Sequence, residues 1–225
     1  MIVAIISDVH SNVVALEAVL EDIETLGAKR IFCAGDIVGY YPFPNETIDL
    51  LKEWNVIAIL GNHDRAVIHF NTVGMNRLAA DAARWTSENI NAENVDYLKS
   101  LRSNLRTKVN KRTIAMYHGS PRDDDEYLYE IDTGPELIEM CACDFMISGH
   151  THIPFVRKFA NGILINPGSV GQPRDGDRKA SYAILDTEHG DVTICRKLYD
   201  INKVHRKVIS VGLPHFLAER LDYGF

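Results

Sequence analysis

Five short apolar runs in this chain each end in a polar turn, and this repeated pattern constrains the fold more than any other feature. The runs are residues 2–6, 31–34, 56–60, 113–117 and 145–147, and the turns are residues 7–10, 35–36, 61–64, 118–121 and 148–152. Apolar runs of this length are typical of buried strands. Because open α/β sheets place their ligands at the carboxyl ends of neighbouring strands, we expect one site built from several strand ends.

The segments between the first three turns predict helices. Between residues 12 and 26 the apolar residues recur at helical spacing, Asn12 or Ser11 can cap the start, and Gly27 can end the helix. A second helix is predicted near residues 45–54. Each helix with its returning strand forms a crossover, so these strands are expected to be parallel and the crossovers right-handed.

The pattern changes after residue 64. Helices are predicted at about residues 75–86 and 93–101, and we interpret about 74–101 as a helical insertion beside the site; a further helix is expected near 135–141. From residue 153 onward the strands read as antiparallel, at 155–159, 163–166, 181–186 and 192–197, and two amphipathic tail helices follow at 200–209 and 214–221. No linker or repeat divides the chain, so residues 1–225 are predicted to form a single domain.

Composition sets limits on function. The formal net charge is −7, which disfavours a surface that neutralises nucleic-acid phosphates, although a metal ion can still attract a small anionic substrate. The spacing of Cys33, Cys141, Cys143 and Cys195 fits neither a zinc motif nor a disulfide framework, so we expect reduced packing residues. The chain shows neither a leader segment nor a span of about 20 apolar residues, so cytoplasm and no membrane partner are expected.

The turns carry a set of metal-ligand side chains. These are Asp8, His10, Asp36, Asn62, His63, His118, His150 and His152. Imidazole, carboxylate and amide ligands without thiolate suit borderline divalent ions, and the set is too large for one ion. Two divalent ions about 3.5–4 Å apart that share a carboxylate would use the whole set and would clamp an in-line displacement at phosphorus. We expect manganese, with iron, nickel, cobalt or zinc as alternatives.

Structural explanations exist for single members of the set. One aspartate at a strand end is commonly a helix cap, and one His-x-His pair commonly lies on a strand face. Caps do not require histidines at positions 10, 118, 150 and 152, each after an apolar strand; the first three lie beside glycine or serine. The combination therefore favours a metal site.

The motifs together resemble those of the calcineurin-like metallophosphoesterases. They are D-x-H at 8–10, G-D at 35–36, G-N-H-D at 61–64, H-G at 118–119 and G-H-T-H at 149–152, and the resemblance extends to about residue 186. The segment N-P-G-S-V at 166–170 is similar to that of the small bacterial and archaeal phosphodiesterases of this superfamily. The resemblance implies a mixed α/β fold, a four-layer αββα sandwich with two mixed β-sheets.

The resemblance also implies roles. One ion would be bound by Asp8, His10 and His152, the other by Asn62, His118 and His150, and Asp36 would bridge them. His63 would be the catalytic general acid or would stabilise charge in the transition state. The implied reaction is hydrolysis of phosphodiester or phosphomonoester bonds in small, nucleotide-like substrates by direct attack of a hydroxide that bridges the metals.

One departure from the superfamily bears on substrate class. The Ser/Thr protein phosphatases carry G-D-x-x-D-R-G, whose second aspartate orients the catalytic histidine, whereas Gly39 stands at that position here. This disfavours a Ser/Thr protein phosphatase-like enzyme and leaves open whether Asp64 or solvent supports His63. Arg65 and Arg122 are expected to bind substrate oxygens, because arginine offers planar paired donors; a solvated surface role is the alternative for both.

Other functions stay open at this stage. A non-catalytic scaffold that uses the same fold to bind proteins is disfavoured because all eight positions are retained, and a DNA nuclease is disfavoured by the acidic balance. Asp123–Asp125 are expected to form a solvated rim rather than a third metal site. The expected partner is a small phosphorylated substrate and no nucleic acid polymer; a homo-oligomer stays open, since Tyr40, Tyr41 and the tail helices offer a surface to a partner.

Overall fold

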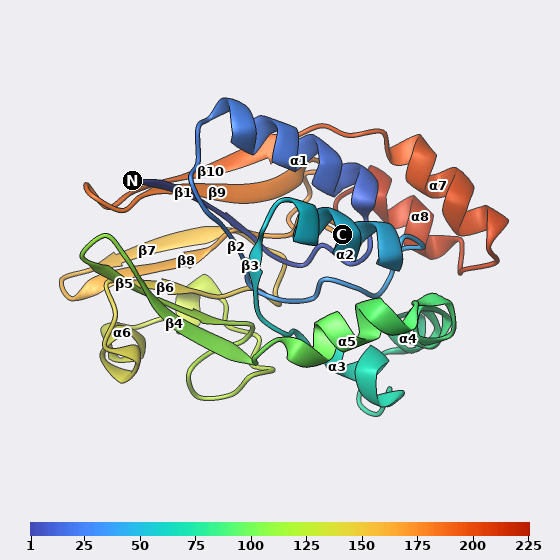
Figure 1. Cartoon of the computed structure of the whole chain (residues 1–225), viewed down its shortest axis with the longest axis horizontal. Coiled ribbons are helices and arrows are strands. Elements are labelled where there is room, and N and C mark those ends of the chain that lie inside the picture. The colour runs from blue at the N-terminus through green and yellow to red at the C-terminus, as the bar shows by residue number, and fades with distance from the viewer.

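The computed structural model describes residues 1–225 and consists of two five-stranded sheets that face each other, with helices on the outside (Figure 1). The first sheet has the order β10-β9-β1-β2-β3 and the second has the order β4-β5-β6-β8-β7. The strands of the first sheet are β1 (Ile2–Ile6), β2 (Ile31–Cys33), β3 (Ile57–Ala58), β9 (Ala180–Asp186) and β10 (Asp191–Lys197). Those of the second are β4 (Asn104–Val109), β5 (Arg112–Tyr117), β6 (Phe145–Ile147), β7 (Phe155–Phe159) and β8 (Gly162–Asn166).

Both sheets are mixed, as predicted. In the first sheet β1, β2 and β3 are parallel, while β9 and β10 are antiparallel to their neighbours. In the second sheet β5, β6 and β8 are parallel, and β4 and β7 join the edges in antiparallel pairs. The expectation that all strands after residue 153 pair antiparallel is wrong for β8, because the β7–β8 hairpin turns β8 back beside β6.

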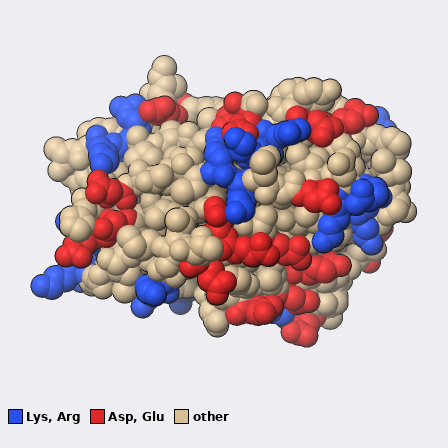
Figure 2. Space-filling model, turned by 90° about the horizontal axis from the view of Figure 1, so that it is seen from above, with Lys and Arg blue, Asp and Glu red and all other residues tan.

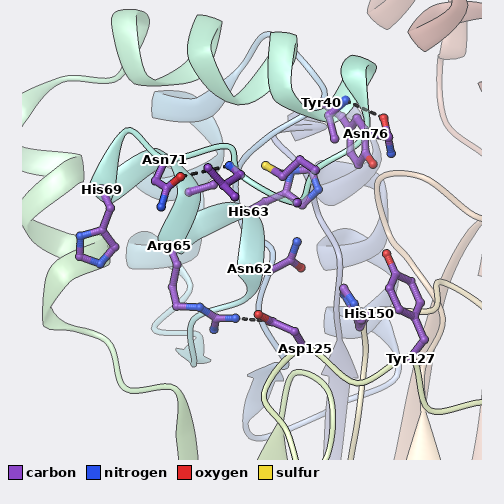
Figure 3. Close-up of a pocket in the computed structure, with 15 residues that line it drawn as sticks. Tyr40, Asn62, His63, Arg65, His69, Asn71, Asn76, Asp125, Tyr127 and His150 are labelled. Carbon is purple, nitrogen blue, oxygen red and sulfur yellow. Dashed lines mark hydrogen bonds and ion pairs between the residues drawn. The ribbon is translucent and has the colours of Figure 1, made fainter.

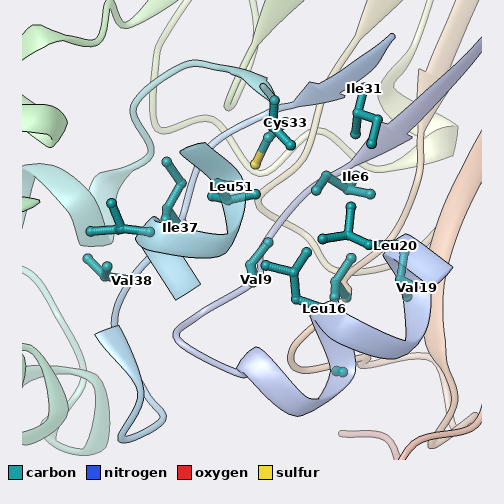
Figure 4. Close-up of a cluster of buried hydrophobic side chains, with 14 of the residues drawn as sticks. Ile6, Val9, Leu16, Val19, Leu20, Ile31, Cys33, Ile37, Val38 and Leu51 are labelled. Atoms are coloured by element: carbon teal, nitrogen blue, oxygen red, sulfur yellow. The ribbon is translucent and has the colours of Figure 1, made fainter. Parts of the chain in front are cut away.

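Side chains along β1 point alternately to its two faces, and this alternation explains how the helix and sheet layers pack. Ala4 and Ile6 face α1 (Val13–Thr25) and α2 (Pro44–Glu53), where they belong to one buried cluster with Leu16 and Leu51 (Figure 4). Val3 and Ile5 point the other way and join a cluster formed between the two sheets. Because successive strand residues point to opposite faces, β1 separates a helix layer from the second sheet. A third cluster buries α6 (Pro135–Cys141) on the outer side of the second sheet, which completes the four layers.

Two elements were not predicted from the sequence. Residues 62–64 were interpreted as part of a turn, but α3 (Asn62–His69) begins at Asn62, and the expected strand at 56–60 is reduced to β3. The edge strand β4 alternates outward-facing Asn104, Arg106 and Lys108 with partly buried side chains, which is typical of a protected sheet edge. The insertion contains α4 (Arg77–Asn89) and α5 (Ala92–Ser100), close to the predicted ranges.

The tail forms α7 (Ile201–Ser210) and α8 (Phe216–Glu219), followed by a 3-10 turn, η2 (Arg220–Asp222); another such turn, η1 (Glu130–Asp132), precedes α6. The tail packs against Tyr40 and Tyr41, which are both buried, in one apolar cluster. The suggestion that these tyrosines offer a surface to a partner is therefore wrong, because the chain itself covers them. None of the helices has the length and apolar character required to cross a membrane.

Candidate active site

The structure brings the eight predicted turn residues to one place between the two sheets. Asp8 and His10 follow β1, Asp36 follows β2, and Asn62 and His63 open α3 after β3; His118 follows β5, and His150 and His152 follow β6. All are buried except Asn62, which is half-buried. Both sheets therefore contribute ligand-type side chains to one centre.

Several residues of these turns have a positive backbone φ angle, which residues other than glycine rarely adopt. The φ angle is +53° at Asp8, +50° at His10, +51° at Asp36, +64° at His150 and +61° at His152. Each such residue costs about 1–2 kcal/mol, and strain of this kind clusters at functional sites. Backbone hydrogen bonds between the turns fix it: the Asp8 amide donates to Gly35 O at 3.0 Å and the His10 amide to Asp36 O at 2.9 Å.

One group of ligand atoms is formed by Asp8, His10 and His152. The Nε2 atoms of His10 and His152 lie 3.1 Å apart, and Asp8 Oδ1 lies 3.2 Å from His152 Nε2. Asp36 Oδ2 is 3.6 Å from His10 Nε2, so it borders this group. Ion-to-ligand bonds of about 2.0–2.2 Å separate neighbouring ligand atoms by roughly 3.0–3.6 Å, so these distances suit a divalent ion.

The second group is formed by Asn62, His118 and His150. His118 Nε2 lies 3.1 Å from both Asn62 Oδ1 and His150 Nδ1. It is also 3.4 Å from Asp36 Oδ2, the same oxygen that borders the first group. Asp36 therefore lies between the two groups, with one oxygen close to both.

Backbone carbonyls orient three of the histidines. The Nδ1 atoms of His10, His118 and His152 donate to the carbonyl oxygens of Val38 (3.3 Å), Ala34 (2.8 Å) and Gln172 (2.5 Å). Since a carbonyl only accepts, Nδ1 carries the proton and Nε2 can present a lone pair to the centre. Asp8 Oδ1 is buried without any hydrogen-bond partner. Lone pairs that face one another at 3.1 Å, beside an unpartnered carboxylate oxygen, fit a bound cation.

At most of these residues the protonation state near pH 7 favours cation binding, because the histidines are neutral and the carboxylates are charged. Burial lowers the pKa of His10 and His152, and lowers that of His150 to about 3, so these rings are neutral near pH 7. Burial opposes ionisation of Asp8 and Asp36, but the neighbouring histidines outweigh it and hold both pKa values below the usual range. His118 is the exception, because the Asp36 carboxylate outweighs burial and raises its pKa to about 10.

His63 lies beside the two groups with no hydrogen bond to its buried Nδ1. Its ring packs between His10 and Tyr40, with centroid distances of 4.7 and 4.6 Å. A Cβ at Gly39 would lie 2.5 Å from His63 Nδ1, so this ring position requires glycine at 39. Packing against Tyr40 and Gly39, rather than a carboxylate, thus orients His63.

Asp64 has another task. Its carboxylate accepts hydrogen bonds from the amides of Ile37 (3.2 Å), Val38 (2.9 Å) and Gly61 (2.9 Å), and it makes none with the His63 ring. These bonds tie the turn after Asp36 to the start of α3. Asp64 therefore fixes the backbone that carries Asp36, Asn62 and His63.

A cavity of about 480 Å³ opens beside the centre (Figure 3). Asn62, His63 and His150 lie at its inner end, and Tyr40 and Tyr127 flank that end. His69, the last residue of α3, and Asn71, which follows the helix, lie farther from the centre. The Tyr127 ring stands 3.9 Å from that of His150. Tyr127 was not singled out from the sequence, since it follows no apolar strand and carries no motif.

The two arginines proposed to hold substrate are both ion-paired. Arg65 lines the cavity and pairs with Asp125, as the dashed line in Figure 3 marks. Arg122 pairs with Glu126 at 2.6 Å and is not among the cavity residues. A third arginine, Arg174, was missed because it stands alone in a loop of mixed charge, with no sequence signal that links it to the centre.

Arg174 is half-buried and its charge reaches several rings of the centre. Burial and then the Arg174 charge lower the pKa of His152, and Arg174 adds to the burial that lowers the pKa of His63 to about 4. Burial raises the pKa of Tyr127, and the Arg174 charge opposes that rise. One guanidinium thus shifts the pKa values of rings in the centre and of Tyr127, which lines the cavity.

Comparisons with known proteins identify the family of this chain. The model of the calcineurin-like phosphoesterase superfamily domain matches residues 1–190. An uncharacterised protein of Methanocaldococcus jannaschii is 38% identical, with 99% of this chain and 98% of that protein covered. Phosphodiesterase YfcE of Escherichia coli is 26% identical over 81% of this chain and 85% of its own.

Solved structures are similar over the full length. A metallophosphoesterase from Sphaerobacter thermophilus is 36% identical, with a TM-score of 0.86 and coverage of 100% of this chain and 99% of that one. A hypothetical protein from Pyrococcus horikoshii has the same fold, with a TM-score of 0.90 at 24% identity over 100% and 98% of the two chains. The expected scaffold of two mixed sheets is confirmed, and the chain belongs to the calcineurin-like phosphoesterase superfamily as a metal-dependent phosphoesterase.

Proposed function

We propose that the chain binds two divalent ions, manganese in the first place, and hydrolyses phosphodiester or phosphomonoester bonds in small, nucleotide-like substrates. Asp8, His10 and His152 would hold one ion, and Asn62, His118 and His150 the other, with Asp36 between them. One observation carries the proposal: Asp36 Oδ2 lies 3.6 Å from His10 Nε2 and 3.4 Å from His118 Nε2. A single carboxylate oxygen so close to two groups of converging ligand atoms supports a dinuclear centre.

When bound, the ions would lower the pKa of water and stabilise charge on the phosphoryl oxygens. The chain itself would position the substrate and supply a donor. A nitrogen of His63 lies within 4.8 Å of the ligand atoms of His10 and Asp36, at the inner end of the cavity. We therefore assign His63 to the reacting oxygens of the substrate, to which its ring would donate a hydrogen bond as charge develops in the transition state.

The shape and charge of the molecule support a small substrate. The cavity of about 480 Å³ falls in the range of small-molecule sites. On the face in Figure 2, basic and acidic side chains alternate, and acidic ones gather over a large part of its lower half. This face has no continuous basic channel of the kind that a nucleic acid polymer requires.

Arg65 and Arg122 stay predictions as substrate-binding residues. Arg65 is placed along the cavity, where a substrate oxygen would have to compete with Asp125 for its guanidinium. Arg122 is held by Glu126 away from the cavity, so its surface role is the better supported of its two alternatives.

Two measurements test the proposed function. Metal analysis after reconstitution with manganese should give two ions per chain, and fewer than one would favour the non-catalytic scaffold. His63→Ala should keep the metal content and lower turnover of an aryl phosphodiester by about 10²–10⁴-fold, the usual effect of one acid–base group. Unchanged turnover in the metal-loaded variant would remove His63 from the reaction.

A further inference from the structure

Arg174 combines a half-buried charge with hydrogen bonds to Gln172 and to Tyr40, which lines the cavity beside the centre. We propose that Arg174 binds a non-bridging oxygen of the substrate's phosphoryl group. This inference rests on the proposed function, since it assigns a residue to the substrate of that same centre.

The charge of Arg174 is not neutralised within the chain. No carboxylate pairs with it, whereas Asp125 pairs with Arg65 and Glu126 pairs with Arg122. Taking a guanidinium partly out of water costs free energy unless an anion compensates for it. An anionic phosphoryl group supplies that missing counter-charge.

The hydrogen bonds of Arg174 leave one end of the guanidinium free. Nε and Nη2 donate to Gln172 Oε1 at 3.2 and 2.9 Å, and Nη2 also donates to the Tyr40 hydroxyl at 3.2 Å. Nη1 has no acceptor in the protein. Both N–H groups of Nη1 therefore remain as charged donors for a ligand oxygen.

The partners of Arg174 place it beside the His10–His152 side of the centre. Gln172, which holds the guanidinium, also accepts through its carbonyl from His152 Nδ1. Tyr40, the other partner, packs 4.6 Å from the rings of both His10 and His63. Arg174 is thus connected through one residue each to His152, by way of Gln172, and to His63, by way of Tyr40.

The loop that carries Arg174 is braced by the tail of the chain. The Gly176 amide donates to Gly224 O at 2.9 Å, and a Cβ at Gly224 would lie 2.7 Å from the Asp177 backbone. Asp175 pairs with Arg196 on β10. Gly224, in the tail, and Arg196, on β10, both lie beyond the residues that match the family model. Their contacts hold the loop, so Arg174 is pre-organised for a ligand.

The test uses full-length, manganese-loaded protein with inorganic phosphate as the probe. Arg174→Ala should raise the dissociation constant of phosphate by about 10–100-fold, the loss expected for a charged hydrogen bond, with an unchanged metal content. In steady-state kinetics with an aryl phosphodiester, KM should rise more than kcat falls. Arg174→Gln should behave in the same way, which guards against a folding defect in the alanine variant.

Two control variants separate direct binding from other effects. Arg178→Ala removes the same charge from an exposed position of the same loop and should change phosphate binding by less than about twofold. Tyr40→Phe removes only the hydroxyl that holds Nη2, and should weaken phosphate binding much less than the loss of Arg174.

Several outcomes overturn the inference. One is a dissociation constant of phosphate for Arg174→Ala that lies within about twofold of the wild-type value. The others are a loss of phosphate affinity in Tyr40→Phe as large as that in Arg174→Ala, and a wild-type protein that does not bind phosphate. Failure of the proposed function would give a different result from failure of this inference. The wild-type protein would then bind phosphate through Arg174 but would not hydrolyse phosphoesters.

Discussion

At the residue scale, Gly39 determines where His63 can lie. A Cβ at this position would approach His63 Nδ1 to 2.5 Å, and the φ angle of +103° disfavours any other residue. We predict that Gly39→Ala displaces the His63 ring and lowers turnover by about 10–100-fold, because small misplacements of a reacting group are costly. Metal content should stay unchanged, and steady-state kinetics with an aryl phosphodiester measures the effect.

Gly27→Ala is the matched control for backbone strain. Gly27 also has a positive φ, +71°, but no atom lies within 4 Å of a Cβ there, and it is exposed at the end of α1. Both variants should lose about 1–2 kcal/mol of stability, whereas only Gly39→Ala should lose turnover. Equal turnover in the two variants would show that Gly39 does not restrain His63.

The sequence could predict which turn residues gather at the centre, because each lies in a turn directly after an apolar strand. Parallel strands carry such turns to one edge, so spacing along the chain is enough to bring Asp8 and Asp36 together. Arg174 and Tyr127 could not be found in this way. Their relation to the centre depends on how a loop packs against Tyr40 and on how the tail braces that loop, which are contacts between segments far apart in the sequence.

At the element scale, Asp64 joins the turn after β2 to the first turn of α3. Its carboxylate satisfies three backbone amides, and burial and the Asp36 charge raise its pKa to about 7. Asp64→Ala leaves those amides without an acceptor, so we expect a loss of about 2–4 kcal/mol and a fall in Tm of about 5–15 °C. Thermal denaturation measures the loss, and manganese binding should weaken as the ligand turns separate.

Asp96→Ala provides the comparison for Asp64. Asp96 is an exposed aspartate on α5 with a surface ion pair to Lys99 at 3.7 Å, and its removal should change stability by less than about 0.5 kcal/mol. An Asp64→Ala protein as stable as Asp96→Ala would show that the three amides find other acceptors.

Elements whose apolar residues recur with a clear period were predictable from the sequence. Two elements, α3 and β4, were not, and each has a physical reason. α3 carries polar residues at Asn62, His63 and Asp64 because the centre needs them there, which obscures the helical pattern. β4 lies at a sheet edge, where charged side chains protect it and reduce the apolar signal. In both cases the demands of function or of the edge outweigh local propensity.

At the scale of the whole molecule, the centre joins the two sheets. Asp8, His10 and Asp36 come from the first sheet, while His118 and His152 come from turns of the second. The apolar cluster between the sheets packs the strands that carry these turns against one another. Bound ions would add ligand bonds across the same interface, so metal binding and the stability of the sandwich are linked.

That linkage extends to protons through His118. Burial by itself would lower its pKa, but Asp36 raises it to about 10, so near pH 7 the metal-free ring is protonated at Nε2 while Nδ1 donates to Ala34 O. A metal ion must displace that proton. Affinity for manganese should therefore increase with pH below the pKa of His118, by up to about tenfold per pH unit.

Calorimetric titration of manganese in buffers of different ionisation enthalpy measures this release directly, and at least about one proton per chain is expected near pH 7. His189→Ala removes an exposed histidine that pairs with Asp186, remote from the ligand turns, and should leave the release unchanged. Heats that do not depend on the buffer, together with an affinity that is flat across neutral pH, would mean that His118 is already neutral before the metal arrives. Asp36 would then interact with the bound ions but would not hold a proton on His118, and metal binding would release no proton from that ring.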